Sequence, residues 1–162
     1  MIITRFQLLI AIMVSILMVS CSEKQPLPDD SPREVTILAQ WDGDYPADSL
    51  SALPSHGRDL PAGYLADAAM FARIWTIFKP DVNVPEVDFA DNIVVYYRNI
   101  TYYNRTSIFK LSLQQGVLEI LARETLSAIP IDDKVSISLA VIPGKDIRFI
   151  KAGDQKIPVE YD

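Results

Sequence analysis

The sequence predicts an α+β domain, a mostly antiparallel β-sheet or partly open barrel with one main packed helix. Between residues 64 and 79, apolar residues recur at spacings of three and four, which indicates a helix with one buried face. After residue 90, short β-branched and aromatic segments alternate with tight-turn residues, which is typical of antiparallel strands. A single helix followed by such strands favours an α+β fold.

The helix is expected over Tyr64–Lys79. Asp67 is a suitable N-terminal cap, and Pro80 ends the helix because proline lacks the backbone N–H that a helix needs. Trp75, on the apolar side of the helix, and Phe89, which follows it, are expected to be largely buried. The apolar stripe that should pack on the sheet contains Leu65, Ala68, Phe71, Ala72, Ile74, Trp75 and Phe78.

The strands are expected to be short and joined by tight turns at Gln115-Gly116, Pro143-Gly144 and Gly153-Asp154. In Lys134–Ile142 the residues alternate strictly, which predicts a half-buried strand with Ser136, Ser138 and Ala140 facing outward. The expected strands are Glu34–Ala39, Asn92–Tyr103, Arg105–Gln114, Val117–Glu124, Lys134–Ile142, Asp146–Lys151 and Lys156–Tyr161.

Residues 40–63 are rich in Pro, Asp, Ser and Gly and contain no clear periodicity. A structureless loop of this length is unusual in a compact domain. Either Trp41, Tyr45 and Leu53 order it in part, or it is a mobile functional loop.

The first 20 residues are typical of a secretory signal peptide, with Arg5 followed by an apolar run over residues 8–19. This run is too short for a comfortable membrane span, which needs about 20 apolar residues. The segment Leu17-Met18-Val19-Ser20-Cys21 resembles a bacterial lipobox. That resemblance implies cleavage after Ser20, acylation of Cys21, and a bacterial envelope lipoprotein held in the bilayer by its acyl chains.

The predicted organisation is a signal peptide over 1–20, a flexible proline-rich tether over 21–33, and one soluble domain over 34–162. Ser22 follows the acylated position. In enterobacterial lipoproteins a residue other than Asp there implies export to the outer membrane, so we expect the domain to face the periplasm.

Composition excludes several classes of function. The chain has 15 Lys and Arg against 21 Asp and Glu, a net charge of −6, which argues against nucleic acid and against charge-driven binding of anionic lipid. Cys21 and His56 are the sole cysteine and histidine, which leaves no plausible zinc ligands and one possible histidine for a catalytic triad. Asp42-Gly43-Asp44 lacks the following Glu of a calcium loop. We therefore expect no metal, no cofactor and no enzyme activity.

The best candidate surface is aromatic and basic. Tyrosine and arginine are enriched at binding hot spots, and several fall within ten residues of one another. Residues two apart on a strand share a face, so one tyrosine of each neighbouring pair should point outward. Tyr97 lies within this cluster. The candidate binding residues are Tyr96, Arg98, Tyr102, Tyr103 and Arg105.

Residues 71–97 show a family resemblance. The helix containing Trp75, the segment Val84-Pro85-Glu86-Val87-Asp88-Phe89 and the strand Ile93-Val94-Val95-Tyr96 are similar to the start of the C-terminal domain of PrcB-like proteins. These are bacterial envelope proteins named for association with a protease complex. The resemblance implies a small β-rich fold and an interaction role. The family's Gly-Gly-Tyr segment corresponds here to Ile100–Thr106, which has no glycine, so no functional residues are carried over.

The sequence therefore predicts a non-catalytic envelope lipoprotein that acts as an interaction or accessory module for another envelope protein. A different reading is a small-ligand or glycan binder that uses the tyrosine–arginine surface. A third reading is a hydrolase that uses Ser127 or Thr125 near Lys134, although no nucleophile-elbow pattern surrounds any serine. A concave cleft would favour the second reading and a flat aromatic face the first.

Overall fold

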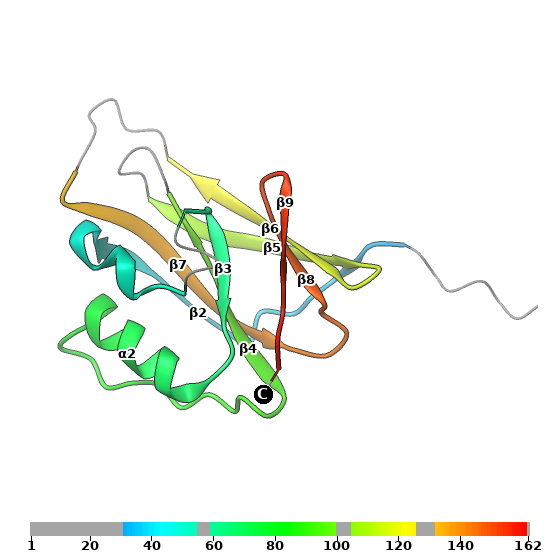
Figure 1. Cartoon of the computed structure of the whole chain (residues 1–162), viewed down its shortest axis with the longest axis horizontal. Coiled ribbons are helices and arrows are strands. Elements are labelled where there is room, and N and C mark those ends of the chain that lie inside the picture. The colour runs from blue at the N-terminus through cyan, green and yellow to red at the C-terminus, as the bar shows by residue number, and fades with distance from the viewer. Residues whose placement is uncertain (1–30, 55–58, 100–104, 126–131, 162) are drawn as a thin grey trace, which may run out of the picture. The chain divides into compact units, whose positions relative to one another are not determined.

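The computed structural model is built mainly of strands and describes residues 31–54, 59–99, 105–125 and 132–161 (Figure 1). The described strands form two open sheets rather than one closed barrel. All neighbouring strands are antiparallel except one parallel pair, so the predicted α+β class with mostly antiparallel pairing is confirmed.

The four-stranded sheet has the order β2-β7-β4-β3 and the five-stranded sheet the order β1-β5-β6-β8-β9. The parallel pair is β6 and β8. The first sheet consists of β2 (Ala39–Pro46), β7 (Lys134–Pro143), β4 (Asn92–Arg98) and β3 (Ala62–Leu65). The second consists of β1 (Arg33–Glu34), β5 (Thr106–Gln114), β6 (Val117–Glu124), β8 (Phe149–Ala152) and β9 (Gln155–Pro158).

The main helix, α2, spans Ala68–Phe78. Its predicted cap is confirmed, because the Asp67 carboxylate accepts a hydrogen bond from the Met70 N–H at 2.7 Å. The predicted start at Tyr64 is wrong. Tyr64 and Leu65 belong to β3, where they pair with Val95 and Val94. Both residues are buried on the sheet, so tertiary pairing outweighs their helical spacing.

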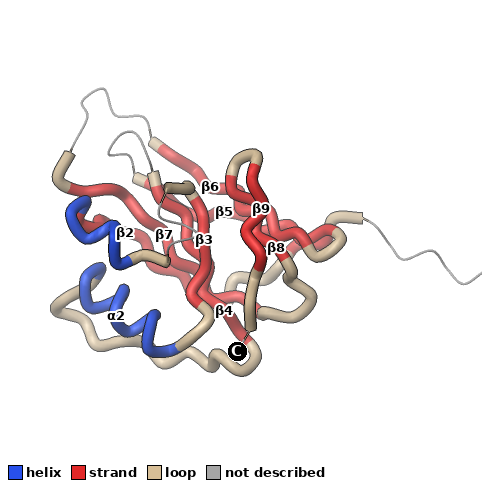
Figure 2. Tube along the Cα trace, viewed as in Figure 1, coloured by secondary structure: helices blue, strands red, loops and turns tan. Residues whose placement is uncertain are grey.

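The elements form three layers, with the four-stranded sheet in the middle. Figure 2 shows the helices on one side of this sheet and the strands of the second sheet on the other. The core under α2 contains Phe71, Ile74, Trp75, Phe78, Tyr45, Leu53, Leu65, Val94, Tyr96, Ile137, Leu139 and Val141. The core between the sheets includes Ile93, Val95, Ala140, Ile142, Ile108, Leu111, Leu118, Ile120 and Ile150.

The burial of Trp75 is confirmed, since 2% of its surface is exposed. Its indole N–H donates to the Val82 carbonyl at 3.0 Å, so the buried polar atom is satisfied. Phe89 is only half-buried, with its ring 5.9 Å from that of Phe71. Asp88 accepts from the Ala90 N–H at 3.0 Å and so forms a turn before β4.

The segment 40–63 is ordered where it is described, which favours the first of its two predicted readings. It contains most of β2, a 3₁₀ helix over Ala47–Ala52, and the start of β3. Tyr45 and Leu53 anchor it in the core under α2. The predicted strand over Glu34–Ala39 is wrong, because β1 ends at Glu34 and β2 begins at Ala39.

The later strands differ from the predictions mainly at their ends. The strand expected over Asn92–Tyr103 ends as β4 at Arg98, and residues 100–104 lie outside the described part. The strands expected over Asp146–Lys151 and Lys156–Tyr161 are observed as β8 and β9. The Gln115-Gly116 hairpin is confirmed, with positive φ values of 52° and 80° that fit a type I′ turn.

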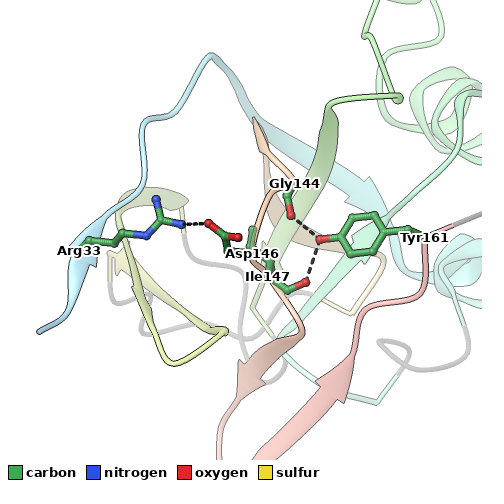
Figure 3. A network of polar contacts seen from close by, with 5 residues as sticks. All are labelled: Arg33, Gly144, Asp146, Ile147 and Tyr161. Carbon is green, nitrogen blue, oxygen red and sulfur yellow. Dashed lines mark hydrogen bonds and ion pairs between the residues drawn. The ribbon is translucent and has the colours of Figure 1, made fainter. Parts of the chain in front are cut away.

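The C-terminal segment is held against the β7–β8 connection (Figure 3). The Tyr161 hydroxyl lies 2.5 Å from the Gly144 carbonyl oxygen and 2.9 Å from that of Ile147. On the same connection, Asp146 forms an ion pair with Arg33 of β1 at 2.9 Å. These contacts place both ends of the described domain next to the C-terminal end of β7, at Pro143.

Candidate functional site

A polar seam joins the two sheets beside β7. The Ser136 hydroxyl accepts from the Thr106 N–H at 2.8 Å, and the Ser138 hydroxyl accepts from the Ile108 N–H at 3.1 Å. The Gln40 amide donates to the Ile108 carbonyl at 2.9 Å. These side chains therefore pair with the backbone N–H and carbonyl groups at the edge of β5, as the backbone of a neighbouring strand would.

The predicted outward face of β7 is thus wrong. Ser136 and Ser138 are buried, with 3% and 0% of their surface exposed, because the second sheet covers them. Small side chains allow β5 to approach β7 closely, and their hydroxyls satisfy backbone groups that burial would otherwise leave unpaired. Sequence alternation alone could not distinguish this face from a solvent face.

A β-bulge decides where the seam ends. The register between β5 and β6 shifts by one residue between Ile108 and Lys110. Before the shift, the backbone groups that point away from β6 belong to even-numbered residues, and after it they belong to odd-numbered residues. Before the bulge this edge faces Ser136 and Ser138. After it, the edge faces β1, where the Val35 N–H donates to the Leu111 carbonyl at 3.0 Å.

The candidate site is an open cleft of about 1100 Å³ beyond the end of the seam. Its lining comes from the middle of β2, the start of β5, the end of β6 and the C-terminus of α2. It is lined by Asp42, Gly43, Asp44, Phe78, Lys79, Arg105, Thr106, Ser107, Arg123, Glu124, Thr125 and Ser136.

The lining carries charges of both signs on rigid elements. The cations are Lys79, Arg105 and Arg123, and the acids are Asp42, Asp44 and Glu124.

Local contacts orient several of these groups. The Lys79 ammonium donates to the Asp42 carbonyl at 3.2 Å and lies 4.6 Å from the centre of the Phe78 ring. Lys134 donates to the Asp44 carboxylate at 2.9 Å. Desolvation by burial raises the pKa of the Glu124 carboxyl above its ordinary value.

Gly43 allows α2 to approach the cleft. A Cβ at this position would lie 2.9 Å from Phe78 Cε2, which is too close for a stable contact, and 3.0 Å from the Nζ of the flexible Lys79 side chain. Glycine at this point of β2 therefore lets the C-terminal turn of α2 lie directly on the strand.

One predicted binding residue lies in this cleft. Arg105 is exposed there, and its backbone N–H donates to the Thr125 hydroxyl at 3.1 Å. Tyr102, Tyr103 and Cys21 lie outside the described residues.

Tyr96 and Arg98 do not belong to an exposed surface, which corrects their prediction as binding residues. Tyr96 is fully buried under α2, and 4% of Arg98 is exposed. Tyr97, on the other face of β4, is half-buried against the core between the sheets. Burial lowers the pKa of Arg98, while the nearby Tyr96 and Asp59 raise it. β4 is a central strand with both faces covered, so neither tyrosine of the pair points freely into solvent.

Sequence reasoning missed most of the cleft. Arg123 and Glu124 end a correctly predicted strand, and the hairpin register places them opposite Ser107 and Thr106. The Gln115-Gly116 turn alone would pair Ser107 with Glu124, and the bulge between Ile108 and Lys110 shifts this register by one residue, so the turn did not predict the pairing. The approach of Lys79 and Asp42 was not predicted either, because it depends on how α2 lies on β2.

Within the described residues, no group of three or more His, Cys, Asp or Glu side chains is placed to hold a metal ion. Among the helices of the described part, none has the length and apolar character needed to span a bilayer.

No protein-family model matches the chain, and searches of curated proteins and of solved structures give no significant match.

Proposed function

We propose that this protein is a non-catalytic lipoprotein of the bacterial cell envelope whose cleft binds a charged polypeptide segment of another envelope protein. The observation that carries the proposal is the cleft itself. Three cations and three acids line it, and they come from β2, the residue before β5, the last residues of β6 and the C-terminal cap of α2. Fixed charges of both signs select a partner by electrostatic complementarity and set its register.

A polypeptide fits this lining better than a glycan. Among the described residues that line the cleft, Phe78 is the one aromatic side chain, whereas sugar sites depend on flat rings. A peptide segment offers carboxylates to Arg105 and basic side chains to Asp44 and Glu124, whereas the Arg123 guanidinium lies 4.5 Å from the centre of the Phe109 ring on the rim of the cleft. Arginine also forms two parallel hydrogen bonds with a carboxylate, which favours it for this role.

The hydroxyl groups of the cleft support a binding role rather than catalysis. Ser136 and Thr125 accept hydrogen bonds from backbone N–H groups, and Ser107 accepts one from Gln40. These three hydroxyls therefore stabilise the backbone around β5, which is a structural role and not that of a nucleophile beside a base. The hydroxyl of Thr106, which also lines the cleft, is buried and has no hydrogen-bond partner among the described residues.

The anchoring part of the proposal rests on the sequence of the N-terminus. Residues 1–20 are the signal peptide, Cys21 is acylated, and residues 21–33 connect the bilayer to the domain. The domain then faces the periplasm from the outer membrane.

A small polar ligand is the second candidate, and the concave shape of the cleft favours it. Its volume of about 1100 Å³ is slightly above the range of about 300–1000 Å³ that is usual for ligand pockets. A small ligand would use the same charged side chains.

The test compares two charge reversals in the full-length chain, Arg105→Glu in the cleft and Lys145→Glu at the other end of β7. Both residues are exposed and both variants change the net charge equally. Crosslinking in membranes followed by detergent extraction should yield one defined protein adduct that Arg105→Glu loses and Lys145→Glu keeps. Equal adducts from both variants would exclude the cleft. A co-purifying small molecule lost only in Arg105→Glu would favour the second candidate.

The anchor is tested separately. Cys21→Ser should abolish incorporation of labelled fatty acid. A Cys21→Ser chain that is still cut after Ser20 and stays firmly in membranes would contradict acylation at this residue.

A further inference from the structure

The outward face of the five-stranded sheet combines large apolar side chains with basic ones. Along β6, Leu118 and Ile120 are buried, so Val117, Glu119, Leu121 and Arg123 point away from the core. The exposed fractions of Phe109, Leu121 and Phe149 are 49%, 40% and 36%.

The apolar side chains lie on neighbouring strands. Leu121 pairs with Lys110 of β5, beside the bulge that turns Phe109 outward. Phe149 of β8 lies next to Val117 of β6. The face therefore presents apolar groups on three adjacent strands rather than a single exposed residue.

The charge of this face is opposite to that of the chain. On the strands of this face, the basic side chains are Lys110, Arg123, Lys151 and Lys156, and the acidic ones are Glu34 and Glu119. A third acid, Asp154 on the turn between β8 and β9, lies close enough to Lys151 to act on its charge. Glu34 pairs with Lys110 at 3.7 Å and Glu119 with Lys151 at 2.6 Å. The face is thus net positive, although the whole chain carries a charge of −6. The net charge that argued against contact with anionic lipid does not describe this surface.

The N-terminal connection reaches the domain at the same sheet. β1, the first described strand, lies at its edge beside β5. The chain advances ten residues from Cys21 to Ser31, and a fully extended segment of that length spans at most roughly 35 Å. An anchor at Cys21 therefore keeps the β1 edge of this sheet within roughly 35 Å of the bilayer.

We infer that the outward face of the five-stranded sheet rests on an anionic membrane surface. This inference rests on the proposed attachment of the N-terminus to the bilayer. The basic side chains contact lipid phosphates, and Phe109, Leu121 and Phe149 enter the headgroup layer. In this orientation α2 and the segment after it lie on the side of the domain away from the bilayer.

The test measures depth in the bilayer at two exposed positions. The full-length chain, as Leu121→Cys or Val84→Cys, is labelled with an environment-sensitive fluorophore and reconstituted in vesicles of phosphatidylethanolamine and phosphatidylglycerol. Leu121 is on the inferred membrane face, whereas Val84 follows α2 on the opposite side, with a similar exposed fraction of 45%. A lipid-borne quencher should remove most of the emission from position 121 and little from position 84. Replacing phosphatidylglycerol by phosphatidylcholine should reduce this difference.

A second measurement uses the unsubstituted chain, so its result does not depend on whether the cysteine variants fold. Acetylation of Lys110, Lys151 and Lys156 should slow on vesicles containing phosphatidylglycerol, whereas that of Lys79, at the end of α2, should not. Equal quenching at positions 121 and 84, or unchanged acetylation of all four lysines, would overturn the inference.

The mass of the protein separates this failure from failure of the anchor. A lipid adduct at Cys21 combined with equal quenching rejects the membrane face alone. Without a lipid adduct, Cys21 keeps a free thiol that would also take up the fluorophore, so both variants are then compared in a Cys21→Ser chain. Selective quenching at position 121 in that chain rejects acylation and retains the membrane face, because the uncleaved apolar residues 8–19 would then hold the chain at the bilayer.

Discussion

Gly63 and Tyr96 lie directly opposite each other in the β3–β4 pair, and the phenol ring of Tyr96 occupies the space above the glycine. A Cβ at position 63 would lie 2.5 Å from Tyr96 Cζ and 2.9 Å from Cε1. Tyr96 is consequently fully buried between β3 and α2. This pairing explains why a tyrosine expected at the surface lies in the core.

Gly63→Ala should therefore destabilise the domain by about 1–3 kcal/mol, the usual effect of overfilling a packed core. The measurement is urea unfolding of the full-length chain in detergent. Combining Gly63→Ala with Tyr96→Phe should leave most of the loss, because ring carbons and not only the hydroxyl meet the new methyl group. A Gly63→Ala domain as stable as the wild type would show that the ring can move aside.

The Tyr96 hydroxyl is buried and has no hydrogen-bond partner among the described residues. Tyr96→Phe should therefore leave stability unchanged or raise it, since an unsatisfied buried polar group is removed. Tyr45→Phe is the matched control. The Tyr45 hydroxyl donates to the Ser49 carbonyl at 3.3 Å, so its removal should cost up to about 1 kcal/mol.

The same tyrosines predict a loss of stability in alkali. Desolvation by burial raises the pKa of Tyr45 to about 12 and raises that of Tyr96 as well. An unfolded tyrosine releases its proton near pH 10, so between pH 10 and 12 the folded state binds more protons than the unfolded state. Stability is therefore fully present below pH 10 and falls as the pH rises toward 12. Tyr96→Phe should flatten this fall, and an identical pH profile would contradict the assignment.

The seam between the sheets predicts a specific role for Ser138. Ser138→Ala leaves the buried Ile108 N–H without its acceptor, which should cost about 1–3 kcal/mol. Ser112→Ala, on the outward side of β5, should change stability by no more than about 0.5 kcal/mol. Thermal melting of both variants tests this difference. Equal melting temperatures would mean that the hydroxyl does not join the sheets.

Arg98 and Arg105 were predicted together as binding residues, but their surroundings now predict opposite effects. Arg98 is buried at the end of β4, so Arg98→Ala should lower stability by at least about 1 kcal/mol. Arg105 is exposed, so Arg105→Ala should leave stability nearly unchanged and weaken partner binding. Melting temperatures and crosslinking yields separate the two effects. Loss of binding in a stable Arg98→Ala domain would return Arg98 to the binding surface.

Local signals in the sequence predicted the parts of the fold that depend on neighbouring residues. The Asp67 cap and the Gln115-Gly116 hairpin are short-range features and were predicted correctly. The placement of Tyr64 in a strand and the burial of Ser136 and Ser138 depend on long-range pairing. Periodicity identifies an apolar face but not whether a second sheet covers the polar one.

The candidate site follows the same rule. Arg105 was identified from the density of tyrosine and arginine residues, and it does line the cleft. Lys79, Asp42 and Arg123 are distant in sequence and meet only because α2, β2 and the β5–β6 hairpin converge. Composition could not predict the cleft, because its charges come from segments that sequence reasoning treats separately.

Site-specific photocrosslinking tests the binding role of the cleft most directly. A benzophenone amino acid replaces Thr125, an exposed and uncharged residue of the cleft lining, in one variant and Lys145, at the opposite end of β7, in another. Arg105 is unchanged in both variants, and both are irradiated in intact cells. We predict one discrete protein adduct from position 125 that position 145 does not give. The adduct peptide should map to a segment carrying charges of both signs. No adduct from position 125, or the same adduct from both positions, would contradict the assignment of the cleft as the partner site.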